Sequence, residues 1–392
     1  MRRAALLLLA ALSLSAVAAS PSGVTVGEAV RLGLTTGPLA GAPEAARRAA
    51  AGEAWAYAAT EADPEVQVQS FLHERSVQLV VPIEAPPATL ARARAARAQV
   101  DAAEVRAQAA RAALGVEIAG MVVAVAEASL VAALQAESET LARRARDRAR
   151  ALAETGEGDR VEAALLEAEA AGALQRALAA ERDRSLAAMR LEQHLGLPIV
   201  GTITVTEWPQ VPAAPRVDPA QLPALVAAEL DARAAIDAEA AARLARLPTL
   251  AVGLGPGWDG ETLGVAGTLN LSLPLYAPSR GARELAGAEV SLAEQRQALL
   301  SAGAVALTYG AESARDQAVA VEAAYAQAPL DGAMAAVTSA YTLGELDLGQ
   351  YLSRRDAVLN AQLAALSARA QRALTELALW ELAGQLPPEW TP

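Results

Sequence analysis

Apolar residues recur at helical spacing along two very long stretches of the chain. No proline interrupts 88–154, which as one helix would measure roughly 100 Å at about 1.5 Å per residue. Its apolar residues recur at spacings near three, four and seven, as the seam of a coiled coil requires: Leu130, Leu134, Leu141, Ala145 and Leu152. Helices of this length are typical of coiled-coil assemblies and not of compact domains.

A short segment before the first stretch alternates apolar and polar residues, which predicts a β-hairpin over 64–84. Its strands are expected over 65–72 and 76–84, around a turn at 73–75. The apolar residues of this hairpin would share one face.

A second hairpin is expected over 248–275, with strands 249–254 and 263–275 around the glycine-rich 255–260. In the last strand, apolar residues alternate with small and polar ones: Leu263, Val265, Leu269, Leu271, Leu273 and Leu275 against Gly264, Ala266, Thr268, Asn270 and Ser272. One side of that strand is therefore predicted to be apolar and the other small and polar.

The two halves of the chain repeat each other. Val77–Pro86 and Leu269–Pro278 each end an alternating strand in Pro-x-x-Ala-Pro, and each opens an alanine-rich helical stretch. Such self-similarity predicts one unit used twice, namely a helix, a hairpin and a pair of long helices. The predicted parts are a signal peptide, 1–20; a first repeat, 21–198, with helical hairpin 87–195; a connector with one extra strand, 199–217; a second repeat, 218–386, with helical hairpin 279–386; and a tail, 387–392.

Local signals mark where the helices begin and break. Thr25 and Glu28 have the spacing of a capping box. In the second repeat, Asp218 and Pro219 supply an N-cap and a proline at the first helical position. Pro329 is expected to break or kink the outgoing helix of that repeat.

The turns between the long helices also match. Each has a glycine that ends one helix, an aspartate three residues later that can cap the next, and a glutamate or glutamine three residues further that would complete a capping box. These residues are Gly156, Asp159 and Glu162 in the first turn and Gly344, Asp347 and Gln350 in the second. The pattern is explained by helix punctuation alone, and it is compatible with contact to a partner or closure of a channel.

Composition narrows the class of protein. Arg2 and Arg3, an apolar run and the small residues 16–18 predict a cleaved secretory signal. Removing those two arginines leaves 31 basic against 45 acidic residues, and the chain has no lysine, so nucleic acid is not an expected partner. With no cysteine, disulfides, thiolate metal sites and an N-terminal lipid anchor are excluded.

Membrane entry is expected through strands. Beyond the signal no uninterrupted apolar run of about 18 residues occurs, so a helical span is not predicted. Four strands cannot close a barrel, which needs about eight, and open edges are not tolerated in hydrocarbon. Several chains would therefore have to pool their strands, and three chains would supply twelve.

The chain resembles the TolC-like outer-membrane efflux protein family over nearly all of its mature length. The resemblance rests on the ordered, duplicated motifs Thr25–Val30, Leu195–Pro198, Arg280–Ala282 behind the second hairpin, the two Gly-Glu-x-Asp turns and Ala340–Glu345. It implies a mainly α protein with a small β part, assembled as a trimer whose 12-stranded barrel continues into a long α-helical barrel. It also implies an outer-membrane location in a Gram-negative-type bacterium and passive exit for substrates of a tripartite efflux or type I secretion system. The implied partners are a periplasmic adaptor, an inner-membrane pump and outer-membrane lipid.

The same resemblance assigns the two turns to the periplasmic gate and adaptor contact. The residues so assigned are Gly156, Asp159, Glu162, Tyr341, Gly344, Asp347 and Gln350. Gln350 and Ser353 stand where some members carry aspartates, so an acidic ring from the second repeat is not expected. Any gating charge is placed on Glu162, Asp159 or Asp347.

Other chemistry finds little support in the residues. Gly255-x-Gly257-x-x-Gly260 lies between two predicted strands and does not lead into a helix, so a hairpin loop is expected there and not a nucleotide site. His73 and His194 are the only histidines, which leaves no convincing zinc site or catalytic triad. No enzyme activity, cofactor or metal is expected. The main rival hypothesis is an exported periplasmic coiled-coil scaffold without a pore.

Overall fold

The computed structural model describes residues 23–59, 65–71, 74–83, 86–205, 207–244, 249–259, 262–272, 279–328, 330 and 332–391. The predicted signal peptide, His73 and Pro329 lie outside these residues.

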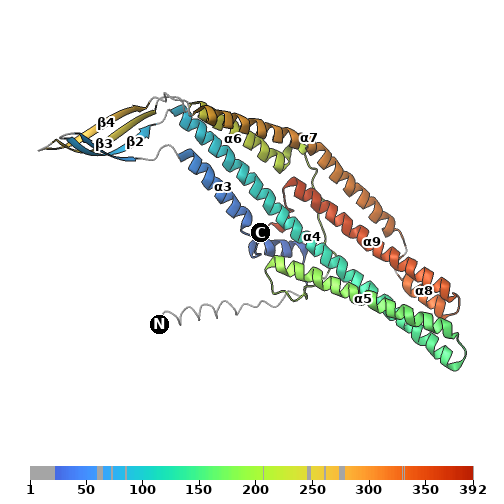
Figure 1. Cartoon of the computed structure of the whole chain (residues 1–392). Coiled ribbons are helices and arrows are strands. Elements are labelled where there is room, and N and C mark those ends of the chain that lie inside the picture. Colours follow the sequence, from blue (N-terminus) through green and yellow to red (C-terminus); the bar gives the residue numbers. More distant parts are fainter. Residues whose placement is uncertain are drawn as a thin grey trace, which may run out of the picture.

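One helix, α4 (Pro86–Thr155), runs nearly the whole length of the molecule, from a small sheet at one end to a helical tip at the other (Figure 1). Its 70 residues span about 105 Å at about 1.5 Å per residue. Nearer the sheet, α4 packs against α3 (Ala42–Ala59) and α6 (Pro223–Leu244). Towards the tip it packs against α5 (Arg160–Leu195) and α9 (Leu348–Ala383).

The remaining helices complete a mainly α architecture. They are α2 (Val26–Thr35), α7 (Ser279–Ala326), α8 (Ala333–Thr342) and the 3₁₀ turns η1 (Pro219–Gln221) and η2 (Pro388–Trp390). In each half of the chain, helix precedes two strands, and the strands precede long helices.

Helix starts follow the local signals with one exception. The predicted capping box is confirmed, because the Thr25 hydroxyl accepts from the Glu28 N–H at 3.3 Å and the Glu28 carboxylate accepts from the Thr25 N–H at 3.0 Å. The helix expected from Asp218 is wrong in its start. Asp218 caps only the single turn η1, and α6 begins at Pro223.

The outgoing helix of the second half is broken, as the sequence predicts. α7 ends at Ala326 and α8 begins at Ala333. Gly332, with φ of +73°, stands at the N-cap of α8. That left-handed backbone is accessible to glycine at little cost and to most other residues only with strain.

The predicted apolar seam of α4 is wrong at two of its five residues, while Ala145 is buried as predicted. Leu130 and Leu152 are exposed and Leu134 and Leu141 are half-buried, whereas a neighbouring stripe of small or uncharged polar residues is buried. The buried stripe is Ala132, Gln135, Ser138, Ala142, Ala145 and Ala149. Since the distance between helix axes depends on the side chains at the contact, small residues let α5 and α9 lie close to α4.

The main hydrophobic core lies midway along the molecule. Val30 of α2, Ile118 and Val122 of α4, Leu191 of α5 and Leu377 of α9 meet there. α4 includes an 18-residue window with mean hydropathy 1.9, which by length and composition could cross a membrane and is 44% buried. The apolar residues at the centre of α4 therefore have a packing role within the fold.

The sheet is antiparallel, in the order β1 (Glu65–Phe71), β2 (Glu74–Ile83), β3 (Thr249–Asp259), β4 (Thr262–Ser272). β2 of the first half pairs with β3 of the second, so the two hairpins form one continuous sheet. β1 and β4 are its edges.

Both predicted hairpin turns are corrected. Glu74 and Arg75 belong to β2 and pair with Phe71 and Ser70. The glycine-rich 255–259 is not a loop but the second half of β3, which pairs with β4 as far as Asp259 and Thr262. Glycine suits this position because a Cβ on Gly255 would lie 1.8 Å from the Val77 carbonyl oxygen.

The connector between the halves does not form the expected extra strand in its described residues. A single backbone hydrogen bond, from Val24 N–H to the Thr204 carbonyl at 3.1 Å, ties it to the chain start. Its beginning instead wraps the buried Glu192 carboxylate, which accepts from the N–H groups of four successive residues, 200–203, at 2.6–3.1 Å.

Candidate functional site

The two turns at the helical tip have the predicted glycines and aspartate caps, but neither predicted capping box forms among the described residues. Gly156 and Gly344 have φ of +79° and +82° and end their helices in the left-handed conformation. Asp159 accepts from the Val161 N–H at 2.8 Å, and Asp347 accepts from the Gln350 N–H at 2.7 Å. Each aspartate therefore caps the helix that follows, as the sequence predicts.

The turns face each other across a cavity of about 380 Å³. It is lined by Asp159 and Glu162 from the first turn and by Tyr341, Gly344 and Asp347 from the second. Five of the seven predicted site residues thus come together, while Gly156 and Gln350 are not part of this lining.

Glu162 and Tyr341 make the direct contact across the tip. The Tyr341 hydroxyl donates a hydrogen bond to the Glu162 carboxylate, which therefore binds across the tip and not to the start of its own helix. Burial, together with that hydrogen bond to Glu162, raises the pKa of Tyr341 well above its usual range, so the phenol remains the donor. The Tyr341 ring also stacks on Tyr351 of α9, with ring centroids 4.4 Å apart.

A buried ion pair missed by the sequence analysis lies further from the tip. Arg355 of α9, only 1% exposed, donates to Glu169 of α5 at 2.6 Å and to Asp356 at 2.8 Å. Arg176 donates to the same Glu169 oxygen at 2.7 Å. Burial would raise the pKa of Glu169, but the hydrogen bonds and charges of the two arginines outweigh it and lower that pKa.

These contacts form three successive levels along one face of α5. Glu162 meets Tyr341 nearest the tip, Leu166 packs in a cluster with Tyr351 next, and Glu169 meets Arg355 last. The spacing of four and three places all three α5 residues on one helix face. Only the four-residue interval between Tyr351 and Arg355 could have signalled this stripe in the sequence.

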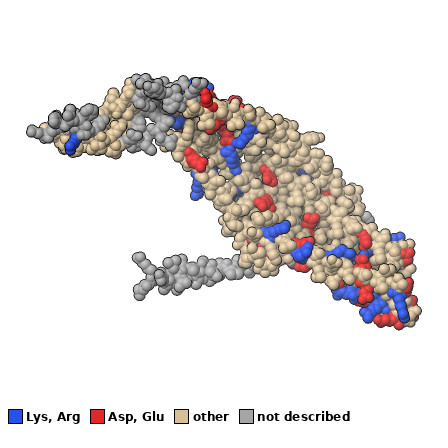
Figure 2. Space-filling model, in the orientation of Figure 1, with Lys and Arg blue, Asp and Glu red and all other residues tan. Residues whose placement is uncertain are grey.

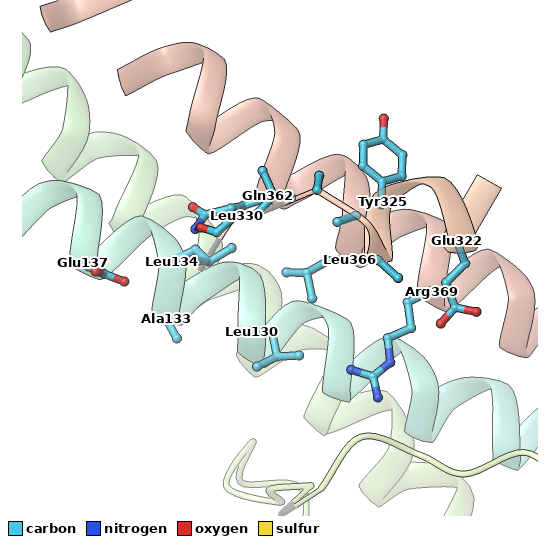
Figure 3. Close-up of a pocket in the computed structure, with 13 residues that line it drawn as sticks. Leu130, Ala133, Leu134, Glu137, Glu322, Tyr325, Leu330, Gln362, Leu366 and Arg369 are labelled. Atoms are coloured by element: carbon cyan, nitrogen blue, oxygen red, sulfur yellow. The ribbon is translucent and has the colours of Figure 1, made fainter. Parts of the chain in front are cut away.

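A cavity of about 570 Å³ lies at the break between α7 and α8. Figure 3 shows Leu130 and Leu134 of α4, Leu330 of the break and Leu366 of α9 around it, with Tyr325 at the end of α7. Gln362 of α9 donates a hydrogen bond to the Leu330 carbonyl at 3.3 Å and so connects α9 to the break. The cavity marks a place where α7 leaves α4 and α9 incompletely covered.

The sheet forms a second candidate site because its faces differ in chemistry. The register places one set of exposed apolar side chains on a single face: Val66, Val68, Val77, Leu79, Val81, Leu254, Trp258, Leu263, Val265, Leu269 and Leu271. The other face is small and polar, and its Thr268 donates to Gln78 at 2.5 Å while Gln78 donates to Ser76 at 3.0 Å.

Burial on the sheet is the reverse of that in a water-soluble sheet. Val265 on the apolar face is 86% exposed, whereas Gln78 on the polar face is 2% exposed. On the face of the molecule seen in Figure 2, charged residues lie along the helices and gather at the tip. An exposed apolar sheet with a polar concave side can face lipid on one side and water on the other.

Comparison with solved structures identifies the architecture. The outer membrane protein VceC from Vibrio cholerae superimposes with a TM-score of 0.77 at 17% sequence identity, over 92% of this chain and 96% of that chain. The outer membrane channel MtrE from Neisseria gonorrhoeae, solved in its open state, gives 0.73 at 17% identity, over 92% and 89%. The outer membrane channel CmeC from Campylobacter jejuni gives 0.72 at 15% identity, over 92% and 85%.

This is the TolC-like outer-membrane channel fold. The mainly α architecture with a small sheet, predicted from the resemblance, is confirmed. No protein-family model and no curated protein sequence matches the chain. At 15–17% identity the likeness is one of fold, and the function of this chain must be argued from its own residues.

Proposed function

We propose that this chain is the subunit of an outer-membrane channel that gives passive exit to substrates of a tripartite efflux or type I secretion system. The observation that carries the proposal is the inverted sheet, on which the apolar face is exposed and the polar face is partly buried. In water, such a face would be an aggregation hazard. In a bilayer, it is the lipid-facing side of a barrel.

The two outer strands of the sheet support the proposal of a homotrimer. In the part of the chain that the structure describes, no strand pairs with the outer sides of β1 and β4, where backbone N–H and C=O groups lack a partner strand. Hydrocarbon does not tolerate such groups, so the strands must close into a barrel. Three copies would supply twelve strands, with the Gln78 and Thr268 side lining a water-filled lumen and the long helices continuing it as an α-helical barrel. The similar order of elements in the two halves supports an internal duplication.

The helical tip is proposed as the gate. The fold extends far from the sheet, so a barrel in the outer membrane would hold the tip deep in the periplasm. Glu162 and Tyr341, joined across the tip, would hold the entrance closed, with Asp159 and Asp347 lining the same cavity. The two turns would also form the surface for a periplasmic adaptor bound to an inner-membrane pump. This surface would include Gly156, Gly344 and Gln350.

Reconstitution tests the proposal. The purified mature protein is expected to have the mass of a trimer in detergent and to produce discrete conductance steps in a planar bilayer. A monomer or dimer that stays in water and never inserts would contradict it. That outcome would favour the rival hypothesis of a periplasmic scaffold, which gives no reason for an exposed apolar sheet.

A further inference from the structure

The contacts at the tip differ in a way that separates a part that can move from a part that cannot. The Glu162–Tyr341 pair is partly buried and lies at a cavity that reaches solvent, so water can replace the hydrogen bond when the pair separates. Arg355 is almost completely buried. Separating it from Glu169 would leave a buried charge without its partner, which is among the costliest changes inside a protein.

The break between α7 and α8 allows α8 to move relative to α7. α8 has only ten residues, too few for a helix to be stable without packing. It packs mainly against α9, and the described residues between α7 and α8, at 327, 328, 330 and 332, are not helical. The cavity of about 570 Å³ at this break leaves room beside it (Figure 3).

The rest of the second half is held firmly. Beyond Arg355, α9 continues without a break to Ala383 and contributes Ala370, Leu377 and Trp380 to the main core. The first half has no corresponding weak point, because α4 is one continuous helix from the sheet to the tip.

We propose that opening moves only a small tip unit, consisting of α8 and residues 343–350, with the buried Tyr351 and the Arg355–Glu169–Arg176 cluster as its fixed pivot. The place where α7 ends and α8 begins is the second joint. This inference rests on the proposed gate and specifies which part of it moves. The alternative is a swing of the whole α7–α9 pair from its end near the sheet.

Two pairs of spin labels distinguish these motions, and the chain has no native cysteine to interfere. One pair, at Glu157 and Leu343, reports on the tip, and the other, at Gln175 and Asn360, lies beyond the pivot. All four residues are exposed. Labelled chains diluted into unlabelled trimers limit the signal to distances within one chain.

The Glu162–Tyr341 hydrogen bond, here called the latch, is removed with Tyr341→Phe or Glu162→Gln. The expected result is a longer mean distance and a broader distance distribution at the tip pair. The distribution at the pair beyond the pivot, called the upper pair, should be unchanged. A comparable shift at both pairs would show that the whole helical pair swings, and no shift at the tip would remove the latch; either result overturns the proposal.

The pivot itself is tested with Arg355→Met in the Tyr341→Phe background. The upper pair should then broaden, because the ionic contact that fixes it is gone. Glu169→Gln keeps the test decisive if the Met variant fails to fold, and an upper distance unaffected by a folded variant would contradict the pivot. Conductance of the same labelled protein is scored separately: silent bilayers with the expected distances would refute the channel and leave the jointed tip intact.

Discussion

The hydroxyl of Tyr341 donates a hydrogen bond to the carboxylate of Glu162, although the two residues are 179 positions apart in the chain. They come from equivalent turns of the two halves and meet because both turns line the same cavity at the tip. A hydrogen bond to a charged acceptor is worth about 1.5–3 kcal/mol. This contact is therefore strong enough to bias a gate and weak enough to be broken by a partner.

Loss of this hydrogen bond is expected to open the channel. Tyr341→Phe keeps the ring stacked on Tyr351 and removes only the donor. About 1.5–3 kcal/mol corresponds to a shift of about ten- to a hundredfold in the ratio of open to closed states. Single-channel recording measures that ratio. Tyr309→Phe, at an exposed tyrosine of α7, is the matched control, and equal open probabilities in both variants would argue against a latch.

Adjacent positions on β4 should respond oppositely to the same charge. Leu269 lies on the apolar face and Asn270 on the polar face. Leu269→Lys should impair insertion, because a lysine facing lipid near the bilayer midplane costs about 2–4 kcal/mol. Asn270→Lys should insert normally and shift ion selectivity towards anions. The yield of trimer in liposomes and the reversal potential are the measurements. Equal insertion of both variants would be inconsistent with a lipid-facing Leu269.

The buried Glu192 predicts an acid-sensitive connector. Burial would raise its pKa, but the four backbone N–H groups of 200–203 outweigh burial and lower it. A lowered pKa means that the stabilisation is complete above the unfolded value of about 4.3 and is lost as the pH falls through the folded value.

Glu192→Gln should therefore lower the melting temperature at neutral pH, with a loss of about 1.5–3 kcal/mol in the free energy of unfolding. The reason is that an amide oxygen accepts hydrogen bonds more weakly than a carboxylate, and the amide NH₂ group repels the backbone N–H donors. The variant should also lose part of the destabilisation that the parent protein shows below about pH 4.3. Glu381→Gln, at an exposed position of α9, is the control. Thermal melts between pH 3 and 7 that match for all three proteins would refute this role.

The C-terminal segment is expected to hold the first helix in place. Trp390 is buried against α2, and Arg31 of α2 donates to the Glu389 carbonyl at 2.7 Å. Trp390→Ala should cost about 3–5 kcal/mol, as for other large buried aromatics, and should let α2 unfold locally, so that trypsin can cleave after Arg31. Faster cleavage after Arg31 than in Thr391→Ala is the expected result, whereas identical digestion would mean that α2 does not depend on the tail.

The long helices and their ends were predictable because they depend on local signals. Thr25, Asp159 and Asp347 act as caps in the structure as predicted, since a cap involves only residues two or three positions away. The strand extent was predicted less well. Gly255 and Gly257 have the local character of a loop, and only pairing of β3 with β2 and β4 makes them strand.

The sequence by itself determined the helical rods, the alternating strands and the capped turns, because periodicity and capping are properties of neighbouring residues. Tertiary structure alone decided that alanines and not leucines form the α4 seam, and that Arg355 is buried against Glu169. It also decided that the polar side of the sheet is the more enclosed one. Each of these depends on how closely distant segments approach, and no local pattern fixes that distance.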